Sequence, residues 1–308
     1  MSAAGRFTED VMTAAMHQVA EEVGARAEDA RLLRLTNNAV FALPAAGIVI
    51  RIARSHGLRD RVHKVVELGR WFGEIDAPTI RLAPDVAQPV RVGDLLASVW
   101  QYVPPTAPEL TMEDLASALR EFHSLNYPQS SLPIWDPVRD ARSRIADGEE
   151  LSDDDRRFLL DWCDYLDRPL ATLQQRAALQ LIHGDAYVGN LLRDKAGRVV
   201  LCDFDATSLG PWQVDLVAVA VGEVRFGRRG AHKALATAYG YDVTTDPNWP
   251  LLREARELKM IAAAVPILQS SPGARAEFSA RLRSVRSGHR HARWQPFAQL
   301  SNAGKQSL

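Results

Sequence analysis

Apolar residues recur with two different periods along the chain. Between residues 31 and 102 they form short runs rich in β-branched side chains, and such runs, bounded by turn residues, predict strands. The strands are expected at 31–35, 39–43, 47–53, 86–92 and 95–102. The residues after Thr8 and residues 59–74 instead place apolar side chains on one face at helical spacing. One helix is therefore expected before the strands and another among them.

Beyond residue 102 the pattern changes. Residues 103–108 contain three prolines, which continue neither a strand nor a helix, and they mark a boundary. Helical periodicity then dominates, with helices expected at 111–125, 152–173, 214–224, 230–239 and 251–268. A short apolar run at 179–183 and a hairpin at 191–203 interrupt the helices, and about the last 20 residues are expected to be loosely held. This order predicts an α+β protein with a small antiparallel-sheet lobe, residues 1–102, and a larger, mostly helical lobe, residues 103–308.

Composition narrows the class of protein. The 308 residues are 46% hydrophobic and 24% charged with a net charge of −1, as in folded, soluble proteins, and neither the charge nor any motif favours nucleic acid. Two cysteines exclude a disulfide framework and a cysteine-rich zinc module. The longest apolar run, Ala39–Ile50, has 12 residues and is too short to span a membrane. Because no secretory signal is visible either, a cytoplasmic protein without membrane partners is expected.

The clearest motif is His-Gly-Asp-Ala-Tyr-Val-Gly-Asn at residues 183–190, followed by the hairpin and by Asp-Phe-Asp at 203–205. Phosphoryl transfer needs a carboxylate that accepts the proton of an attacking hydroxyl, and oxygen ligands that hold Mg²⁺ on the nucleotide phosphates. In kinase-type sites the loop aspartate is the base, and the asparagine and the aspartate after the hairpin hold the metal. Asp185 is therefore the candidate base, Asn190 and Asp203 are candidate Mg²⁺ ligands, and ATP is the expected donor.

Together with Gly-Pro-Trp-Gln-Val-Asp-Leu at residues 210–216, this pattern resembles the aminoglycoside phosphotransferase and choline kinase-like family, a relative of the protein kinases. The resemblance covers most of the chain and includes Leu119–His123. It implies a bilobal protein kinase-like fold with ATP bound between the lobes, and it implies that Asp215 braces the catalytic loop. The adenine-facing hinge implied by the resemblance is formed by Gln101, Tyr102 and Val103.

Two positions depart from the family pattern. Arg51 stands on the third strand where the family has a phosphate-binding lysine, and it supplies a permanent cation with a fork of donors. Thr36-Asn37-Asn38 replaces the glycine-rich loop. Glu67, on the following helix, is a candidate partner for Arg51, with the register of that helix open by about one turn.

The charge distribution bears on the acceptor. Residues 225–308 hold 14 Lys and Arg against 5 Asp and Glu, so this segment carries +9 while residues 1–224 carry −10. In the family the acceptor side is built mainly from the C-terminal part of the chain. A polycationic aminoglycoside would be repelled there, so a neutral or anionic small-molecule acceptor is expected.

The favoured hypothesis is an ATP- and Mg²⁺-dependent kinase that phosphorylates a hydroxyl of a small molecule such as an antibiotic, a sugar or an amino alcohol. The basic C-terminal segment supports an alternative, a kinase acting on Ser or Thr of a peptide or protein. The altered loop and Arg51 support a second alternative, a nucleotide-binding pseudokinase without activity. A transition-metal site built from His183, Asp185, Asp203 and Asp205 is a further alternative.

Overall fold

The computed structural model describes residues 8–35, 38–53, 59–127, 132–148, 150–268 and 271–300. These residues form two compact units. Unit 1 consists of the described residues up to Asp114 together with Val188–Ala206, and unit 2 consists of Leu115–Tyr187 and the described residues from Thr207 onward. The second segment of unit 1 begins inside the His-Gly-Asp…Asn motif, three residues after Asp185. The division into functional lobes at residues 102 and 103 stays a prediction.

Unit 1 is built around an antiparallel sheet. Its elements are, in chain order, α1 (Glu9–Glu22), β1 (Arg31–Leu35), β2 (Asn38–Leu43), β3 (Ile48–Ala53), α2 (Arg59–Glu74), β4 (Val90–Val92), β5 (Leu95–Gln101), the 3-10 turn η3 (Val188–Asn190), β7 (Leu191–Arg193), β8 (Val199–Leu201) and η4 (Phe204–Ala206). The five-stranded sheet has the order β1-β2-β3-β5-β4, and β7 pairs with β8 in a separate hairpin. The expected strands and the helix at 59–74 are therefore present, with the fourth strand shortened to three residues.

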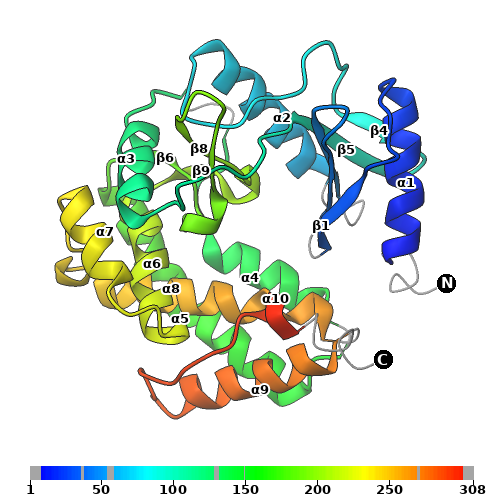
Figure 1. Ribbon diagram of the computed structural model, residues 1–308. Coiled ribbons are helices and arrows are strands. Elements are labelled where there is room, and N and C mark those ends of the chain that lie inside the picture. Colours follow the sequence, from blue (N-terminus) through cyan, green and yellow to red (C-terminus); the bar gives the residue numbers. More distant parts are fainter. Residues whose placement is uncertain are drawn as a thin grey trace. The chain divides into compact units, whose positions relative to one another are not determined.

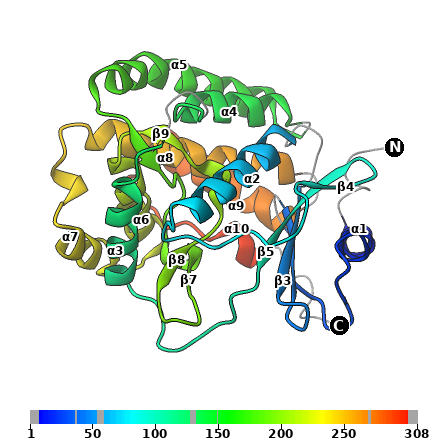
Figure 2. The same ribbon diagram turned by 90° about the horizontal axis from the view of Figure 1, so that it is seen from above.

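Alternation along β3 decides which residues reach the pocket described below. Ile50 and Ile52 are fully buried and pack with Met12 and Met16 of α1 on one face of the sheet. Arg51 has the opposite parity, so its side chain leaves the sheet on the other face, which α2 covers (Figures 1 and 2). This arrangement follows from the period of two in a strand, since consecutive side chains point to opposite faces.

The β7–β8 hairpin is attached to the segment between α2 and β4. The amide of Leu201 donates to the carbonyl of Pro78 at 2.8 Å, and the amide of Ile80 donates to the carbonyl of Leu201 at 2.9 Å. Phe204, directly after the hairpin, packs its ring 4.9 Å from that of Phe72 in α2. These contacts fix the two ends of the hairpin, where Asn190 and Asp203 stand, within unit 1.

Unit 2 is mainly helical. Its elements are α3 (Met112–His123, which begins at the end of unit 1), α4 (Pro137–Ala146), α5 (Asp153–Arg176), β6 (Gln180–Ile182), β9 (Ser208–Gly210), α6 (Gln213–Phe226), α7 (Ala231–Tyr239), η5 (Val243–Thr245), α8 (Trp249–Ala262), η6 (Val265–Ile267), α9 (Pro272–Arg286) and α10 (Phe297–Leu300). Strands β6 and β9 pair antiparallel. Helix α4 packs along α8, as Figure 1 shows. Among the described helices, none joins sufficient length to the hydropathy that crossing a membrane requires.

Helices α4 and α9 were not expected from the pattern. Both are strongly polar, and α9 buries only a narrow stripe that includes Ala274, Phe278 and Leu282 at a spacing of four residues. The expectation of a loosely held tail is wrong at Trp294, which is 4% exposed and lies beneath the buried guanidinium of Arg225. This polar segment is held in place because the ring of Trp294 packs against a buried guanidinium, a cation–π contact.

Candidate active site

Unit 1 contains a pocket of about 300 Å³. Apolar side chains from β1, β2, β3, β5 and the β7–β8 hairpin form most of its wall, and charged or amide side chains form the rest. Its lining residues are Leu33, Arg34, Val40, Val49, Arg51, Ile80, Trp100, Gln101, Tyr102, Val103, Pro105, Gly189, Asn190, Leu192, Cys202, Asp203 and Phe204. The structure therefore brings six of the seven predicted site residues to one pocket, and the seventh, Asp185, belongs to unit 2.

The three residues of the predicted hinge differ in whether their backbone amides are already hydrogen-bonded. The amide of Tyr102 donates to the carbonyl of Gly47 at 2.8 Å, and the amide of Gln101 donates to the carbonyl of Arg81 at 2.9 Å. Within the described residues, the amide of Val103 has no hydrogen-bond partner. Of the three hinge residues, Val103 is thus the one whose N–H is available to a flat heterocycle in the apolar part of the pocket.

Arg51 forms ion pairs with both acids of the Asp-Phe-Asp segment. One of its nitrogens lies 2.9 Å from Oδ1 of Asp203 and 2.5 Å from Oδ2 of Asp205. The hypothesis that Glu67 pairs with Arg51 is wrong: Glu67 is exposed, and within the described part of the chain Arg51 pairs with these two aspartates. The register of α2 turns Lys64 toward the Asp-Phe-Asp segment instead, because Lys64 donates to the backbone carbonyl of Asp205 at 2.7 Å.

Asp205 is held by charge and by a hydrogen bond. Its Oδ2 also accepts from the amide nitrogen of Asn38 at 3.0 Å. Burial by itself raises the pKa of Asp205, but the charges of Arg51 and Arg61 and these hydrogen bonds outweigh burial and hold the pKa below its ordinary value. Asp205 is therefore ionised at neutral pH and fixes the position of Arg51. Thr36 and Asn37, the rest of the loop that replaces the glycine-rich segment, lie outside the described residues.

Asp203 and Asn190 have the donor atoms for a hard cation. Both line the pocket, and the carbonyl of Asn190 accepts from the amide of Cys202, which ties the two ends of the hairpin together at 2.9 Å. Asp203 has a φ of 70°, a left-handed conformation that a non-glycine residue adopts at a cost, as is common at functional sites. Carboxylate and amide oxygens suit Mg²⁺, which takes its remaining ligands from phosphates and water.

A metal held by protein side chains alone does not fit. In the part of the chain that the structure describes, no three His, Cys, Asp or Glu side chains form a group that could hold a metal ion. The alternative transition-metal site is therefore not supported. The residues present fit a Mg²⁺ ion that is shared between Asn190, Asp203 and the phosphates of a bound nucleotide.

Arg34 is a pocket residue that sequence reasoning missed. It lies on β1, and its guanidinium is 3.0 Å from Oδ2 of Asp203, so the two oxygens of Asp203 each contact an arginine. The signal was weak, because an arginine in a half-exposed strand is ordinary. Its position in the pocket makes it a second cation available to phosphate oxygens.

Asp185 lies in unit 2 beside two cations of α8. Its Oδ1 is 3.0 Å from a guanidinium nitrogen of Arg256 and 4.0 Å from Nζ of Lys259, and its side chain is 40% exposed. Burial alone raises the pKa of Asp185, but the charges of Lys259 and Arg256 hold that pKa well below its ordinary range. Sequence reasoning counted Arg256 and Lys259 in the basic segment but did not place them at Asp185.

Asp215 braces the loop that carries Asp185, as the resemblance implied. Its carboxylate is fully buried and accepts from the amides of His183 at 2.8 Å and Gly184 at 2.7 Å. Nε2 of His123 lies 2.9 Å from the same carboxylate, and the hydroxyl of Tyr239 lies 2.9 Å from Nδ1 of His123. Burial raises the pKa of Asp215, yet the hydrogen bond and charge of His123 hold it below its ordinary value.

Residues 29–258 match the model of the phosphotransferase enzyme family. The chain belongs to this family. The match includes parts of both units and every predicted site residue. The expected relationship, and the prediction of an enzyme that transfers a phosphoryl group to an alcohol, are therefore confirmed at the level of the enzyme class. No curated protein matches the chain.

Solved structures that resemble this member of the family have the kinase-like fold. An amicoumacin kinase in complex with AMP-PNP, Ca²⁺ and Ami is 12% identical, with a TM-score of 0.66, and covers 91% of this chain and 95% of its own. An aminoglycoside phosphotransferase from Streptomyces rimosus is 17% identical, with a TM-score of 0.59, over 80% of this chain and 98% of its own. A choline kinase from Streptococcus pneumoniae is 12% identical, with a TM-score of 0.63, over 88% and 99%. The predicted α+β, protein kinase-like fold class is confirmed.

Proposed function

We propose that this phosphotransferase uses ATP and Mg²⁺ to phosphorylate a hydroxyl of a small, neutral or anionic molecule in the cytoplasm. The observation that carries the proposal is the pocket of unit 1. It combines an apolar wall and the N–H of Val103, which has no partner among the described residues, with two arginines, a carboxylate and a side-chain amide. An adenine ring needs the first set of groups, and a triphosphate with its metal needs the second.

The dimensions of the pocket suit a nucleotide. Gln101 pairs with Ile48 and Ser98 pairs with Arg51 across strands β5 and β3, so three residues separate the hinge end from Arg51. At about 3.3 Å per residue, that separation is roughly 10 Å, which is the scale of the span from a base to its phosphates. The structures of related proteins contain AMP-PNP, ATP, ADP or GDP, which also supports a nucleotide donor.

In the proposed reaction, Asp185 orients the acceptor hydroxyl and takes its proton. The acceptor oxygen forms a bond to the γ-phosphorus, the bond to the β–γ bridging oxygen breaks, and ADP leaves with that electron pair. Asn190 and Asp203 would hold Mg²⁺, which neutralises charge on the phosphates when bound. Arg51 and Arg34 bind phosphate oxygens, and Asp205 keeps Arg51 in position.

The test is phosphate transfer by purified protein. ATP, Mg²⁺ and a panel of sugars, antibiotics, amino alcohols and a Ser/Thr peptide library are screened by coupled ADP release, and products are identified by mass. Asp185→Asn and Asp203→Asn are expected to lower turnover by about 10²-fold or more. Two substitutions of exposed aspartates are the controls: Asp161→Asn in unit 2 and Asp85→Asn in unit 1. Asp85 also matches Asp203 in having a positive φ.

The outcomes separate the alternatives. Phosphorylated small molecules support the proposal, and a mass gain confined to peptides supports a peptide kinase instead. Tight ATP binding without transfer to any acceptor would indicate a nucleotide-binding protein without activity. Full activity of Asp185→Asn would refute the role of Asp185.

A further inference from the structure

Two cations of α8 converge on Asp185, all within unit 2. Arg256 and Lys259 are three residues apart in the helix, so their side chains leave the same face. Lys259 donates from Nζ to the carbonyl of Gly184 at 2.6 Å, and Arg256 donates to Oδ1 of Asp185 at 3.0 Å. The two side chains are 25% and 17% exposed, so each is largely buried while part of it reaches solvent.

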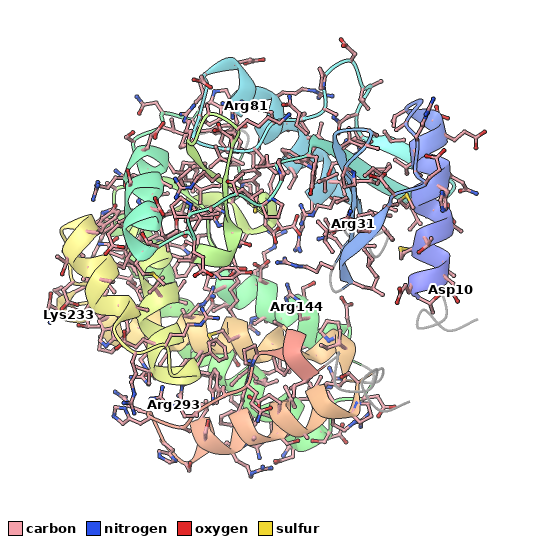
Figure 3. All side chains as sticks on the ribbon, viewed as in Figure 1. Asp10, Arg31, Arg81, Arg144, Lys233 and Arg293 are labelled. Atoms are coloured by element: carbon pink, nitrogen blue, oxygen red, sulfur yellow. The ribbon has the colours of Figure 1, made fainter. Side chains whose placement is uncertain are left out.

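Further charged side chains of α4 lie near Lys259. Helix α4, packed along α8, contributes Arg144 and the exposed Asp140, both close enough to Lys259 to influence its charge (Figure 3 labels Arg144). Glu257, the acidic residue next to Arg256 on α8, pairs with Arg225 and does not neutralise this cluster. In addition, Nε of Arg256 is buried and has no hydrogen-bond partner within the described residues.

The contacts to Asp185 and Gly184 do not use every donor of the two cations, because Nε of Arg256 has no partner within the described residues. One cation is enough to neutralise one carboxylate, and two cations beside a catalytic base make it a weaker base. Burying a charged donor costs free energy unless an acceptor pairs with it, and a second anion would pair with the donors that Asp185 does not use. The cluster is therefore suited to a second negatively charged group besides Asp185.

We propose that Arg256 and Lys259 bind an anionic oxygen group of the acceptor, a carboxylate or a phosphate, beside the hydroxyl that Asp185 deprotonates. This inference rests on the proposed function and names the acceptor class: hydroxy acids or phosphorylated alcohols. The proton still goes to Asp185, and ADP still leaves as described above.

The experiment measures binding with matched three-carbon probes. The protein is saturated with ADP and Mg²⁺, so that anions do not bind at Arg34 and Arg51, and is titrated calorimetrically with glycerol, glycerate, glycerol 3-phosphate and choline. At least one of the two anions is expected to bind 10-fold or more tightly than glycerol and choline. The comparison of glycerate with glycerol 3-phosphate distinguishes a carboxylate from a phosphate. Equal binding of all four probes, or of none, would overturn the inference.

Variants assign the effect to the cluster. Arg256→Gln and Lys259→Met remove each positive charge while keeping an unbranched side chain, and each is expected to weaken anion binding about 10-fold, while Arg256→Lys retains part of the affinity. Lys233→Ala removes an exposed cation of the same basic segment and is the matched control. Anion affinity that is unchanged in both cluster variants, or lowered equally in the control, contradicts the inference.

Two further measurements keep the interpretation clear. In the unaltered protein, affinity for the anionic probe is expected to fall as KCl rises while affinity for glycerol stays constant, a result that does not depend on the folding of any variant. The ADP titration itself tests the proposed function. Failure of ADP to bind would therefore count against the nucleotide site, whereas failure of the anions with ADP bound counts against the cluster alone.

Discussion

The guanidinium of Arg51 lies 2.5 Å from the carboxylate of Asp205, and this pair replaces the expected pair between Arg51 and Glu67. Asp205, which follows the end of the β7–β8 hairpin, holds the cation that we propose binds the phosphates. The pairing joins β3 to the segment that contains Asp203, so the cation and the candidate metal ligand are positioned by the same contact.

Replacement of Asp205 by asparagine is expected to weaken ATP binding by about 10-fold, since Arg51 loses the charge that holds it. Glu67→Gln is the control and should leave ATP affinity unchanged, because Glu67 is exposed. Affinities are measured by calorimetry with ATP and Mg²⁺. A larger effect of Glu67→Gln than of Asp205→Asn would restore Glu67 as the partner.

Arg34 is expected to contribute to phosphate binding from β1. Arg34→Ala should raise the Kd for ATP about 5- to 10-fold, with a smaller effect on adenosine, which has no phosphate. Arg31→Ala is the matched control, because Arg31 is exposed on the same strand and does not line the pocket (Figure 3). Equal losses for ATP and adenosine would mean that Arg34 shapes the pocket and does not bind phosphate.

Asp215 is expected to be essential for stability. Asparagine offers one acceptor oxygen where the amides of His183 and Gly184 need two, so Asp215→Asn leaves a buried donor unpaired and should cost about 2–4 kcal/mol. Urea unfolding monitored by circular dichroism gives this free energy. Asp161→Asn, at an exposed position of unit 2, should change it by less than about 0.5 kcal/mol.

The pH dependence of turnover tests the environment of Asp185. Because Lys259 and Arg256 hold its pKa below the ordinary range, Asp185 stays ionised through neutral and mildly acidic pH. Its contribution to stability and activity is present above the ordinary carboxyl pKa and is lost only as pH falls through the lowered value. Turnover should therefore show no loss from Asp185 between about pH 5 and 8.

In Arg256→Gln the acid limb of that profile should move to higher pH, since the carboxylate loses one of its two cations. The profile is measured at saturating ATP with an acceptor that the screen has shown the enzyme to phosphorylate. An acid limb that does not move in the variant would show that Arg256 does not act on the protonation of Asp185.

Local sequence determined the order of elements and the chemistry of the motif. The period of two in residues 48–53 put Arg51 opposite Ile50 and Ile52, and helical spacing set the bounds of α2, because these signals depend on neighbours in the chain. Side-chain chemistry likewise singled out Asn190 and Asp203 as candidate metal ligands, since few residue types can hold a metal. The bracing role of Asp215 was implied by the family resemblance instead. Helices α4 and α9 escaped detection because their apolar stripes are narrow.

Only the tertiary structure decided which charges meet. Arg256 reaches Asp185 across 71 residues of sequence, and Arg51 reaches Asp203 across 152. The face that a helix turns toward its neighbours depends on its rotation about its own axis, which packing settles. The sequence thus determined the reaction class, whereas folding determined the partners of its charged groups and, with them, the acceptor class that we infer.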